Sequence, residues 1–482
     1  MKNIHYTFML FILLFFSLVS FSCKDILEED PKGLLSQKTF WNNDQNAIGA
    51  INSAYAAPIE STNREHTWTF HFESAAQDFR NFDVNYSMVN GTWSSNTFHF
   101  IDCWRNNYAP ISRANFVLSN LPTATISEAL KTRIDGEARF IRANYYFNLV
   151  RAFGDVPLIL KQSESTDDFL VKRTPTKEVY QAIISDLETA IKQLPLKSTY
   201  KAADIGRASK GAAQGLLAKV YLTLGDFENA KTLTQQVIDS KEYGLQPKFA
   251  DIFKAENDNG PEWLFSYQSM GSQPQNNHIT GAWTFPNISG VDGFASGFGN
   301  IVVSLEALDL YDKTDTRLND MIWNQYTTTA GDVIKFNKGT GYFSKKYYDL
   351  GFSKNVAFTR INYPILRYSD ILLMNAEATN ELSPLSADAL EKLNMVRQRA
   401  NTKPLTRADV SSKEAMLNEI MEERRREFLN ENQRLWDLKR RGKFLEYVRK
   451  FEYSKHQDYM NLFPIPQIEM DANPNLVQNP GY

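Results

Sequence analysis

The segment Ala208–Ile238 constrains the fold more than any other part of the chain, because it has the pattern of two antiparallel helices joined by a tight turn. In its first half, small and apolar residues occupy two adjacent faces of a helix, so this helix must be covered on several sides. Gly225 is placed as a left-handed helix cap, and Asp226 is placed as the N-cap of the second helix. One hairpin cannot cover its own apolar faces. The segment therefore predicts further helix pairs packed beside it.

The spacing of small and aromatic residues in this hairpin resembles the interior of a tetratricopeptide unit. Counted from Ala218 it reads Ala-x2-Tyr-x3-Gly-x-Phe-x2-Ala, in which the small residues let two helices touch. Helical periodicity recurs in several other segments, namely Asp44–Ala57, 104–121, Asp135–Phe153, 175–194, Ile365–Leu382, Ala387–Ala400 and Ser411–Asn430. We therefore predict a mostly α fold built from an array of tetratricopeptide-like helix hairpins.

Two long stretches, 58–103 and 243–364, interrupt the helical pattern with irregular mixtures of Gly, Asn, Pro and aromatic residues. They contain only short β-like pieces, such as Trp263–Gln268 and Gly341–Tyr348. These stretches predict an irregular, loop-rich lobe with short strands, inserted into a helical scaffold made of residues 44–57, 104–242 and 365–482.

Two features near the C-terminus make further predictions. The run Arg424-Arg425-Arg426 lies in a helical segment with interleaved glutamates, including an i,i+4 pair of Glu422 with Arg426 on the outer face. This pattern favours a salt-bridged helix over a phosphate site.

Residues 460–482 contain four prolines. Because proline is incompatible with a helix interior, we predict an extended tail laid over the helices.

Residues 1–22 have the pattern of a bacterial export signal, in which Lys2 precedes an apolar run that is too short to span a bilayer comfortably. The small residue directly before Cys23 resembles a lipobox, in which Cys23 would become the lipid-modified N-terminus after cleavage. Ser20 stands where the usual leucine would be. Residues 23–43 are polar and acidic at their start, and we expect them to form a tether and lead-in. The alternative is an ordinary secreted protein with a free Cys23.

The amino-acid composition excludes some classes of function and indicates a globular protein. Lys and Arg together number 53 against 56 for Asp and Glu, giving a net charge of −3, so no basic excess indicates a nucleic-acid partner. The hydrophobic share of 43% in a chain of 482 residues is enough for a large globular core. Two cysteines cannot form a disulfide framework, and Cys103, next to Trp104, is expected to be a small buried apolar residue.

Six segments carry a resemblance to a known family, namely Cys23, Glu137–Ile159, Gly211–Ala230, Ile365–Ala378, Glu423–Lys443 and Leu462–Tyr482. In this order, over nearly the whole chain, they resemble the SusD/RagB family of Bacteroidetes surface lipoproteins, which capture nutrients, chiefly glycans, for a TonB-dependent transporter. The resemblance implies a single domain over residues 44–482, with about four tetratricopeptide-like pairs supporting a variable ligand-binding lobe. It also implies a SusC-like transporter as partner, and surface exposure on the outer membrane through a lipid anchor.

Glycan binding requires flat aromatic faces against sugar C–H groups and planar polar groups that reach neighbouring hydroxyls. Both kinds of side chain are frequent in residues 64–107 and 260–330. The candidate ligand-binding residues are Asp78, Arg80, Trp93 and Asn96 in the first stretch, and Trp283, Phe285, Trp323 and Tyr326 in the second. The alternative is that these aromatic residues fill the core of the lobe. Trp104 and Trp436 are expected in the core.

No sequence motif indicates catalysis. The chain has no HExxH, GxSxG, Walker or CxxC motif and no metal-spaced pair among its six histidines. We therefore predict binding without chemistry, with no cofactor and no metal. Three alternatives stay open: a lid of the same transporter type that binds peptide or another nutrient, a glycosidase whose paired carboxylates are not readable from the sequence, and a helical adaptor for proteins.

Overall fold

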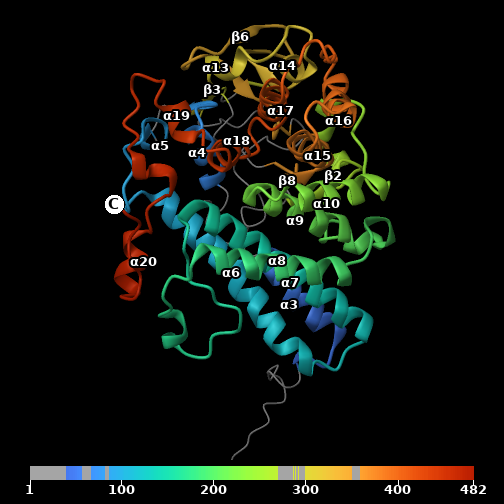
Figure 1. Cartoon of the computed structure of the whole chain (residues 1–482), viewed down its shortest axis with the longest axis vertical. Helices are drawn as coiled ribbons and strands as arrows, with labels where there is room; N and C mark the ends of the chain where they lie inside the picture. The colour runs from blue at the N-terminus through green and yellow to red at the C-terminus, as the bar shows by residue number, and fades with distance from the viewer. Residues whose placement is uncertain are drawn as a thin grey trace, which may run out of the picture.

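The computed structural model describes residues 40–56, 67–81, 86–269, 299–349 and 359–482, together with positions 286, 288, 291 and 292 (Figure 1). Cys23, Trp283 and Phe285 lie outside these residues, so the predictions made for them stay predictions. Within the described ranges, no helix combines the length and apolar character needed to cross a bilayer.

Most of the described chain is helical, as predicted. The helices that build the array are α3 (Asp44–Ala56), α6 (Phe98–Asn120), α7 (Glu128–Phe153), α8 (Thr176–Gln193), α9 (Lys210–Leu224), α10 (Phe227–Asp239), α15 (Tyr368–Leu382), α16 (Ala387–Arg399) and α17 (Lys413–Glu427). Neighbours pack in the order α6, α7, α8, α9, α10, α15 and α16, and α17 packs against α15 (Figure 1). Segments far apart in the sequence therefore form one stack, because α10 adjoins α15 directly.

The remaining helices are short and lie mainly around the lobe and the C-terminal segment. They are α4 (Thr67–Ala75), α5 (Tyr86–Asn90), α11 (Phe249–Ile252), α13 (Leu305–Leu308), α14 (Thr316–Met321), α18 (Arg434–Arg440), α19 (Phe444–Val448) and α20 (Gln467–Ala472). Several of our expectations are wrong here. Residues 58–103 contain α4 and α5, and residues 243–364 contain α11, α13 and α14, where no helix is predicted. α6 starts at Phe98 rather than Trp104, residues 365–367 belong to a strand rather than to a helix, and the C-terminal tail contains α20. α20 is possible because Pro466 precedes it and Pro474 follows it, so no proline interrupts its hydrogen bonds.

Short strands join parts of the chain that are distant in sequence. They are β1 (Phe79–Asn81), β2 (Trp263–Tyr267), β3 (Ile301–Val303), β4 (Ile322–Trp323), β5 (Gln325–Thr327), β6 (Val333–Lys335), β7 (Phe343–Ser344) and β8 (Tyr363–Arg367). They pair antiparallel as β1 with β3, β2 with β8, β4 with β7 and β5 with β6. The prediction of short strands in an otherwise irregular lobe is confirmed.

The hairpin of α9 and α10 has the predicted turn. Gly225 adopts a left-handed conformation with φ of 76°, and the Asp226 side chain accepts a hydrogen bond from the Asn229 backbone N–H. Nearly every residue of α9 is buried, because α8, α10, α15 and the β2–β8 pair surround it. Gly215 lets α9 approach this strand pair. A Cβ atom there would lie 2.5 Å from Leu366 Cδ2 and 2.7 Å from Ile371 Cδ1.

We expect Gly215→Val to destabilise the protein by about 1–3 kcal/mol, because the added methyl groups would overpack a site without free space. Gly49→Ala is the matched control, since Gly49 is an exposed helix glycine whose added Cβ meets no atom within 4 Å. That change should stabilise by roughly 0.5–1 kcal/mol through helix propensity. Urea unfolding midpoints measure both effects. Equal midpoints for the two variants would contradict the close approach of α9 to β8.

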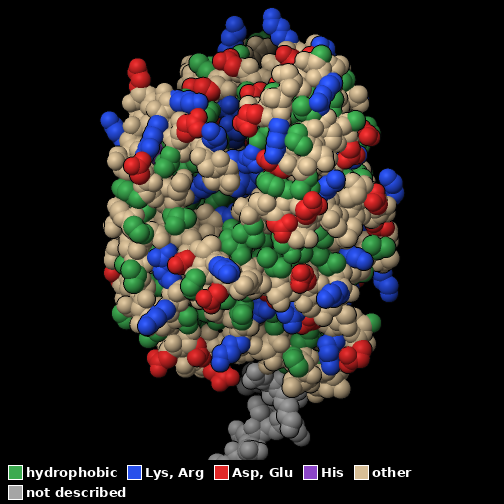
Figure 2. Space-filling model, viewed as in Figure 1, with side chains coloured by type: hydrophobic (Ala, Val, Ile, Leu, Met, Phe, Trp, Pro, Cys, Tyr) green, Lys and Arg blue, Asp and Glu red, His purple; other side chains and the backbone are tan. Residues whose placement is uncertain are grey.

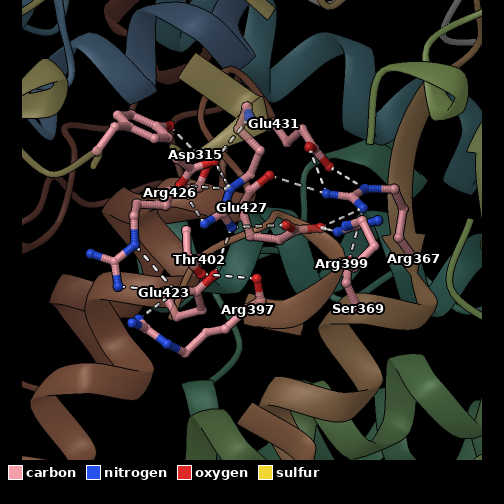
Figure 3. A network of polar contacts seen from close by, with 12 residues as sticks. Asp315, Arg367, Ser369, Arg397, Arg399, Thr402, Glu423, Arg426, Glu427 and Glu431 are labelled. Atoms are coloured by element: carbon pink, nitrogen blue, oxygen red, sulfur yellow. Dashed lines mark hydrogen bonds and ion pairs between the residues drawn. The ribbon is translucent and has the colours of Figure 1, made fainter. Parts of the chain in front are cut away.

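A buried ion network connects α17 to both the lobe and the array (Figure 3). At its centre, the Glu427 carboxylate contacts Arg367 on β8 at 2.9 Å, Arg317 on α14 at 3.2 Å and Arg399 on α16. The side chains of all four residues are at most 3% exposed. Burial opposes ionisation of Glu427, but the three arginines outweigh it and hold the pKa of this carboxyl well below its ordinary value.

Further carboxylates extend the network on both sides of Glu427. Glu423 contacts Arg317, Arg397 and Arg426 at 2.6, 3.2 and 2.9 Å; Glu431 contacts Lys346 and Arg367 at 2.6 and 2.8 Å; and Glu262 contacts Arg367 and Arg399 at 2.5 and 3.0 Å. The predicted salt-bridged helix is thus confirmed, although its strongest pairs are buried and join different elements. The predicted outer pair, Glu422 with Arg426, is present at 3.8 Å.

Glu427→Gln should destabilise the protein by about 3–5 kcal/mol, because removing one charge leaves buried arginines without a counter-charge. The matched control on the same helix is Glu422→Gln. The Glu422 side chain is 52% exposed, so its loss should cost less than about 1 kcal/mol. Chemical unfolding at pH 7 tests the difference. A similar, small effect of both substitutions would show that the network does not hold α17 in place.

Candidate functional site

Asp78 follows α4 and is fully buried. Its Oδ1 accepts a hydrogen bond from Arg425 Nε on α17 at 2.6 Å. This pair attaches the turn after α4 to α17, and a ligand has no access to the carboxylate in this conformation. Asp78 therefore has a structural role, and we do not assign it to a ligand-binding surface.

Arg80 on β1 lies in a surface cluster of aromatic and charged side chains. Its guanidinium donates to Glu306 Oε1 at 2.9 Å and to Gln77 Oε1 at 2.6 Å. The same group lies 5.1 Å from the ring centres of both Phe451 and Tyr453. Because the Arg80 and Glu306 side chains are 17% and 40% exposed, part of this planar arrangement reaches solvent. The Arg80 guanidinium is therefore suited to donate hydrogen bonds to the hydroxyl groups of a ligand.

Trp93 is 4% exposed and belongs to the core. Its indole Nε1 donates to the Tyr482 hydroxyl at 2.9 Å, and its ring packs edge-on against Phe100, His456 and Phe463. Asn96, in the turn before α6, is exposed, and its neighbour Ser95 contacts Gln467 in the C-terminal segment. Trp93 is therefore a core aromatic residue, which is the alternative stated above for these candidates. Asn96 is accessible and stays a candidate for ligand binding.

The burial of His456 beside Trp93 predicts how the stability of the folded protein depends on pH. His456 is buried beside this ring, and burial, with a smaller contribution from Arg449, lowers the pKa of His456 to about 4. Below pH 6.5 the unfolded chain binds a proton at this residue while the folded chain does not, so stability should fall as the pH falls from 6.5 to 4. His456→Gln should remove up to about 3 kcal/mol of this loss.

Urea unfolding of wild type and His456→Gln at pH 4.5, 5.5 and 7 measures this effect as a difference in slope. The substitution would also lower stability at every pH through altered packing, so only the change between pH values is informative. Parallel pH profiles for the two proteins would contradict a buried, neutral His456.

Trp323 on β4 is 6% exposed and lies among other rings. The ring centres of Tyr326, Phe336 and Tyr348 lie at 6.2, 5.2 and 4.8 Å, and Lys345 Nζ lies 5.3 Å from the indole ring centre. Trp323 is therefore a core residue of the lobe in this conformation. It supports its neighbour Tyr326, which is partly exposed.

Tyr326 keeps an accessible ring at the edge of this aromatic group. Its hydroxyl donates to Asp292 Oδ2 at 2.7 Å, and Asp292 also accepts from the Thr329 backbone N–H and hydroxyl. Desolvation and the Asp292 carboxylate raise the pKa of Tyr326 to about 12, so the hydroxyl stays protonated at neutral pH. The ring is held at a fixed angle and is available to a ligand.

The strands connect the two candidate stretches. Arg80 on β1 lies opposite Val302 on β3, and Trp323 on β4 lies opposite Phe343 on β7. β3 is linked to the start of β7 by the hydrogen bond from Val303 N to Tyr342 O at 2.8 Å. Arg80 and the Trp323–Tyr326 group therefore belong to one run of strands, which we call the lobe surface. Asn96 belongs instead to the turn that contacts the C-terminal segment.

Sequence reasoning missed a concave region between the helical array and β2. Two adjoining cavities of about 490 and 480 Å³ lie there, and we call them the junction groove. Their lining includes Tyr55, Tyr145, Ile205, Arg207, Phe265 and Gln268. Tyr55 and Tyr145 were read only as helix residues, and no motif marks the segment around Ile205. Only the presence of polar and aromatic residues on adjacent helices would have indicated the groove.

No three His, Cys, Asp or Glu side chains in the described residues form a group suited to a metal ion. Cys103 is buried, as predicted. Figure 2 shows Lys and Arg side chains gathered in a hollow in the region of α4 and α18. Beneath the surface, the buried side chains of Arg424 on α17 and Arg440 on α18 contact Asp437, and Arg424 also contacts Asp370.

Comparison with known protein families gives two matches. Residues 317–482 match the profile described as the SusD family, and residues 27–222 match the one described as starch-binding associating with outer membrane. SusD-like protein P2 from Formosa agariphila is 30% identical to this chain, over 98% of this chain and 99% of the relative.

Solved structures share the fold over almost the whole chain. A laminarin-binding SusD-like protein is 26% identical, with a TM-score of 0.77, and the match covers 92% of this chain and 100% of that one. Surface glycan-binding protein A from Bacteroides thetaiotaomicron, solved in complex with laminarihexaose, has a TM-score of 0.77 at 23% identity, covering 90% of this chain and 99% of that one. This second likeness concerns the fold alone.

Proposed function

The chain belongs to the SusD/RagB family, and on that basis we propose that it is a cell-surface lipoprotein that captures oligo- or polysaccharide and delivers it to a SusC-like TonB-dependent transporter without catalysis. The strongest support is the likeness to a laminarin-binding SusD-like protein, because that likeness extends over 92% of this chain. Laminarin is therefore the first ligand to test.

The lobe surface supplies chemistry that suits a sugar. Tyr326 offers a partly exposed ring held by Asp292, and Arg80 offers a planar group held by Glu306. An aromatic ring covers the C–H face of a sugar with little loss of side-chain entropy, and fixed planar groups bind hydroxyls without reorganisation. We propose these two residues as ligand contacts, with Asn96, Trp283 and Phe285 as further predicted contacts. In this proposal Trp323 does not contact the sugar; it packs against Tyr326 and holds that ring in position.

Delivery to a transporter requires that the protein stay at the membrane. We propose lipid modification at Cys23 as the anchor, with residues 24–43 as the tether that leads to α3. The match of residues 27–222 to a profile associated with the outer membrane supports this location. The SusC-like partner follows from family membership.

The test is retardation in a native gel containing laminarin, using the soluble form without residues 1–23. Wild type should be retarded, and Tyr326→Ala should bind about tenfold more weakly, since a ring contact is worth up to roughly 1.4 kcal/mol. Tyr459→Ala is the control, because Tyr459 is 37% exposed but lies in the C-terminal segment. Equal retardation of both variants would remove Tyr326 from the site. No retardation by laminarin, starch or other glycans would refute glycan capture.

The same protein separates binding from catalysis. Incubation with laminarin should produce no new reducing ends over hours, because binding alone cleaves no glycosidic bond. Reducing ends that appear in proportion to protein concentration would favour a glycosidase. Acid variants of the lobe that abolish such product, while binding persists, would establish it.

A further inference from the structure

The junction groove lies at the boundary between the array and the β2–β8 pair. Its two cavities share a wall formed by Ile205, Gly206, Arg207 and Phe265. α3 and α7 contribute to the first cavity, and residues 197–200 and 259–264 contribute to the second. Among the described residues, none that lines either cavity belongs to 79–103 or 299–349. The groove is therefore separate from the lobe surface.

Three charged side chains that line the groove have hydrogen-bond partners within the protein, and a fourth, Lys241, is exposed. Arg207 donates to Asp204 Oδ1 at 2.7 Å and to Glu137 Oε2 at 3.0 Å. Lys197 Nζ donates to the backbone carbonyls of Gly260 and Trp263 at 2.5 and 2.9 Å. Glu242 accepts from the Ser198 N–H and hydroxyl, both at 2.8 Å. Because Arg207, Lys197 and Glu242 already have partners, these three side chains do not require an ionic ligand, and a neutral polar ligand suits them.

Hydrogen bonds also fix the polar walls in place. The side-chain amides of Gln268 and Asn259 bind each other reciprocally, at 2.7 and 3.0 Å. Gly206 has a φ of +96°, and a Cβ atom there would lie 2.6 Å from Gln268 Cδ, so only glycine allows this wall. The Tyr55 hydroxyl accepts the Ala208 N–H at 3.0 Å. A site whose walls are already ordered loses little entropy on binding.

The first cavity combines aromatic rings with a free amide donor. Tyr145 and Tyr267 lie nearly parallel, with ring centres 6.2 Å apart and an interplanar angle of 7°, and Tyr55 and Phe265 also line the cavity. Asn52 Oδ1 accepts from Arg207 Nη2 at 2.8 Å, and its Nδ2 donates to no described residue. Aromatic rings beside planar amides, without an uncompensated charge, form the chemistry that recognises sugars.

We propose that the junction groove is a second oligosaccharide-binding site, on the array side of the molecule. Each cavity falls within the roughly 300–1,000 Å³ typical of small-ligand pockets, so together they accommodate more than one ring. In this site the ring of Tyr55 faces the sugar and Asn52 donates to a hydroxyl, while Phe265, Tyr145 and Tyr267, each at most 6% exposed, form the wall behind them. The inference rests on the proposed function in that both require a glycan ligand.

Two adjacent exposed alanines test the proposal. Ala203 lines the first cavity and Ala202 does not, although both are exposed in the same turn. Ala203→Trp should fill the groove, and Ala202→Trp should leave it open. Because both positions are exposed, both variants should keep the wild-type thermal unfolding midpoint. Asn52→Ala gives an independent variant that removes a donor rather than adding volume.

The measurement is calorimetric titration of the full soluble chain with laminarihexaose and, separately, maltohexaose. Wild type should bind at two sites; Ala203→Trp and Tyr326→Ala should each lose a different one, by at least tenfold in affinity. Asn52→Ala should weaken the Ala203-sensitive site several-fold, and Ala202→Trp should match wild type.

Each other outcome has a defined meaning. Unchanged binding by Ala203→Trp, with loss in Tyr326→Ala, would overturn the groove site and leave the proposed function intact. Binding that Ala203→Trp abolishes and Tyr326→Ala does not affect would support the groove while removing the lobe surface. No binding of either oligosaccharide by wild type would refute both. Binding of a neutral tetrapeptide that Ala203→Trp abolishes, without sugar binding, would overturn the assignment to carbohydrate.

Discussion

The buried contacts of Glu427 join three arginines from parts of the chain that are distant in sequence. Arg317, Arg367 and Arg399 come from a lobe helix, a strand beside α9 and an array helix, and all three contact one carboxylate. Taking these charges out of water is unfavourable, so the arrangement is stable only when every partner is present. The network therefore adds directed contacts to the apolar packing between the lobe and the array.

The fixed position of α17 determines what happens to the first candidate stretch. Arg425, next to the centre of the network, reaches outward and binds Asp78, while Glu73 accepts the backbone N–H groups of Asn430 and Asn432. α4 is thereby drawn onto the end of α17, and the segment that follows is closed by the C-terminal residues, where Tyr482 accepts the Trp93 indole N–H. Residues expected at a binding surface are consequently used to join the two ends of the chain.

The sequence predicted what depends on local pattern and failed on what depends on distant partners. Gly225 and Asp226 act as predicted because a turn and a cap involve residues only a few positions apart. Trp93 could not be assigned, since its burial depends on Tyr482, 389 positions away in the sequence. The burial of Asp78 likewise depends on a partner that is distant in the sequence, Arg425. Tyr326 and Arg80, chosen for their residue types, are partly exposed, and their role as ligand contacts stays a prediction.

With the proposed second site in the junction groove, the helical array does more than support a lobe. Glu137 on α7 holds Arg207, which in turn holds Asn52 on α3, so the groove takes its rigidity directly from the packing of the helices. A variable loop gains affinity by adding contacts, but it also loses entropy when it becomes ordered. A groove built on packed helices avoids that loss. A chain with both kinds of surface can retain a long glycan at the rigid site while the lobe determines which glycan is bound.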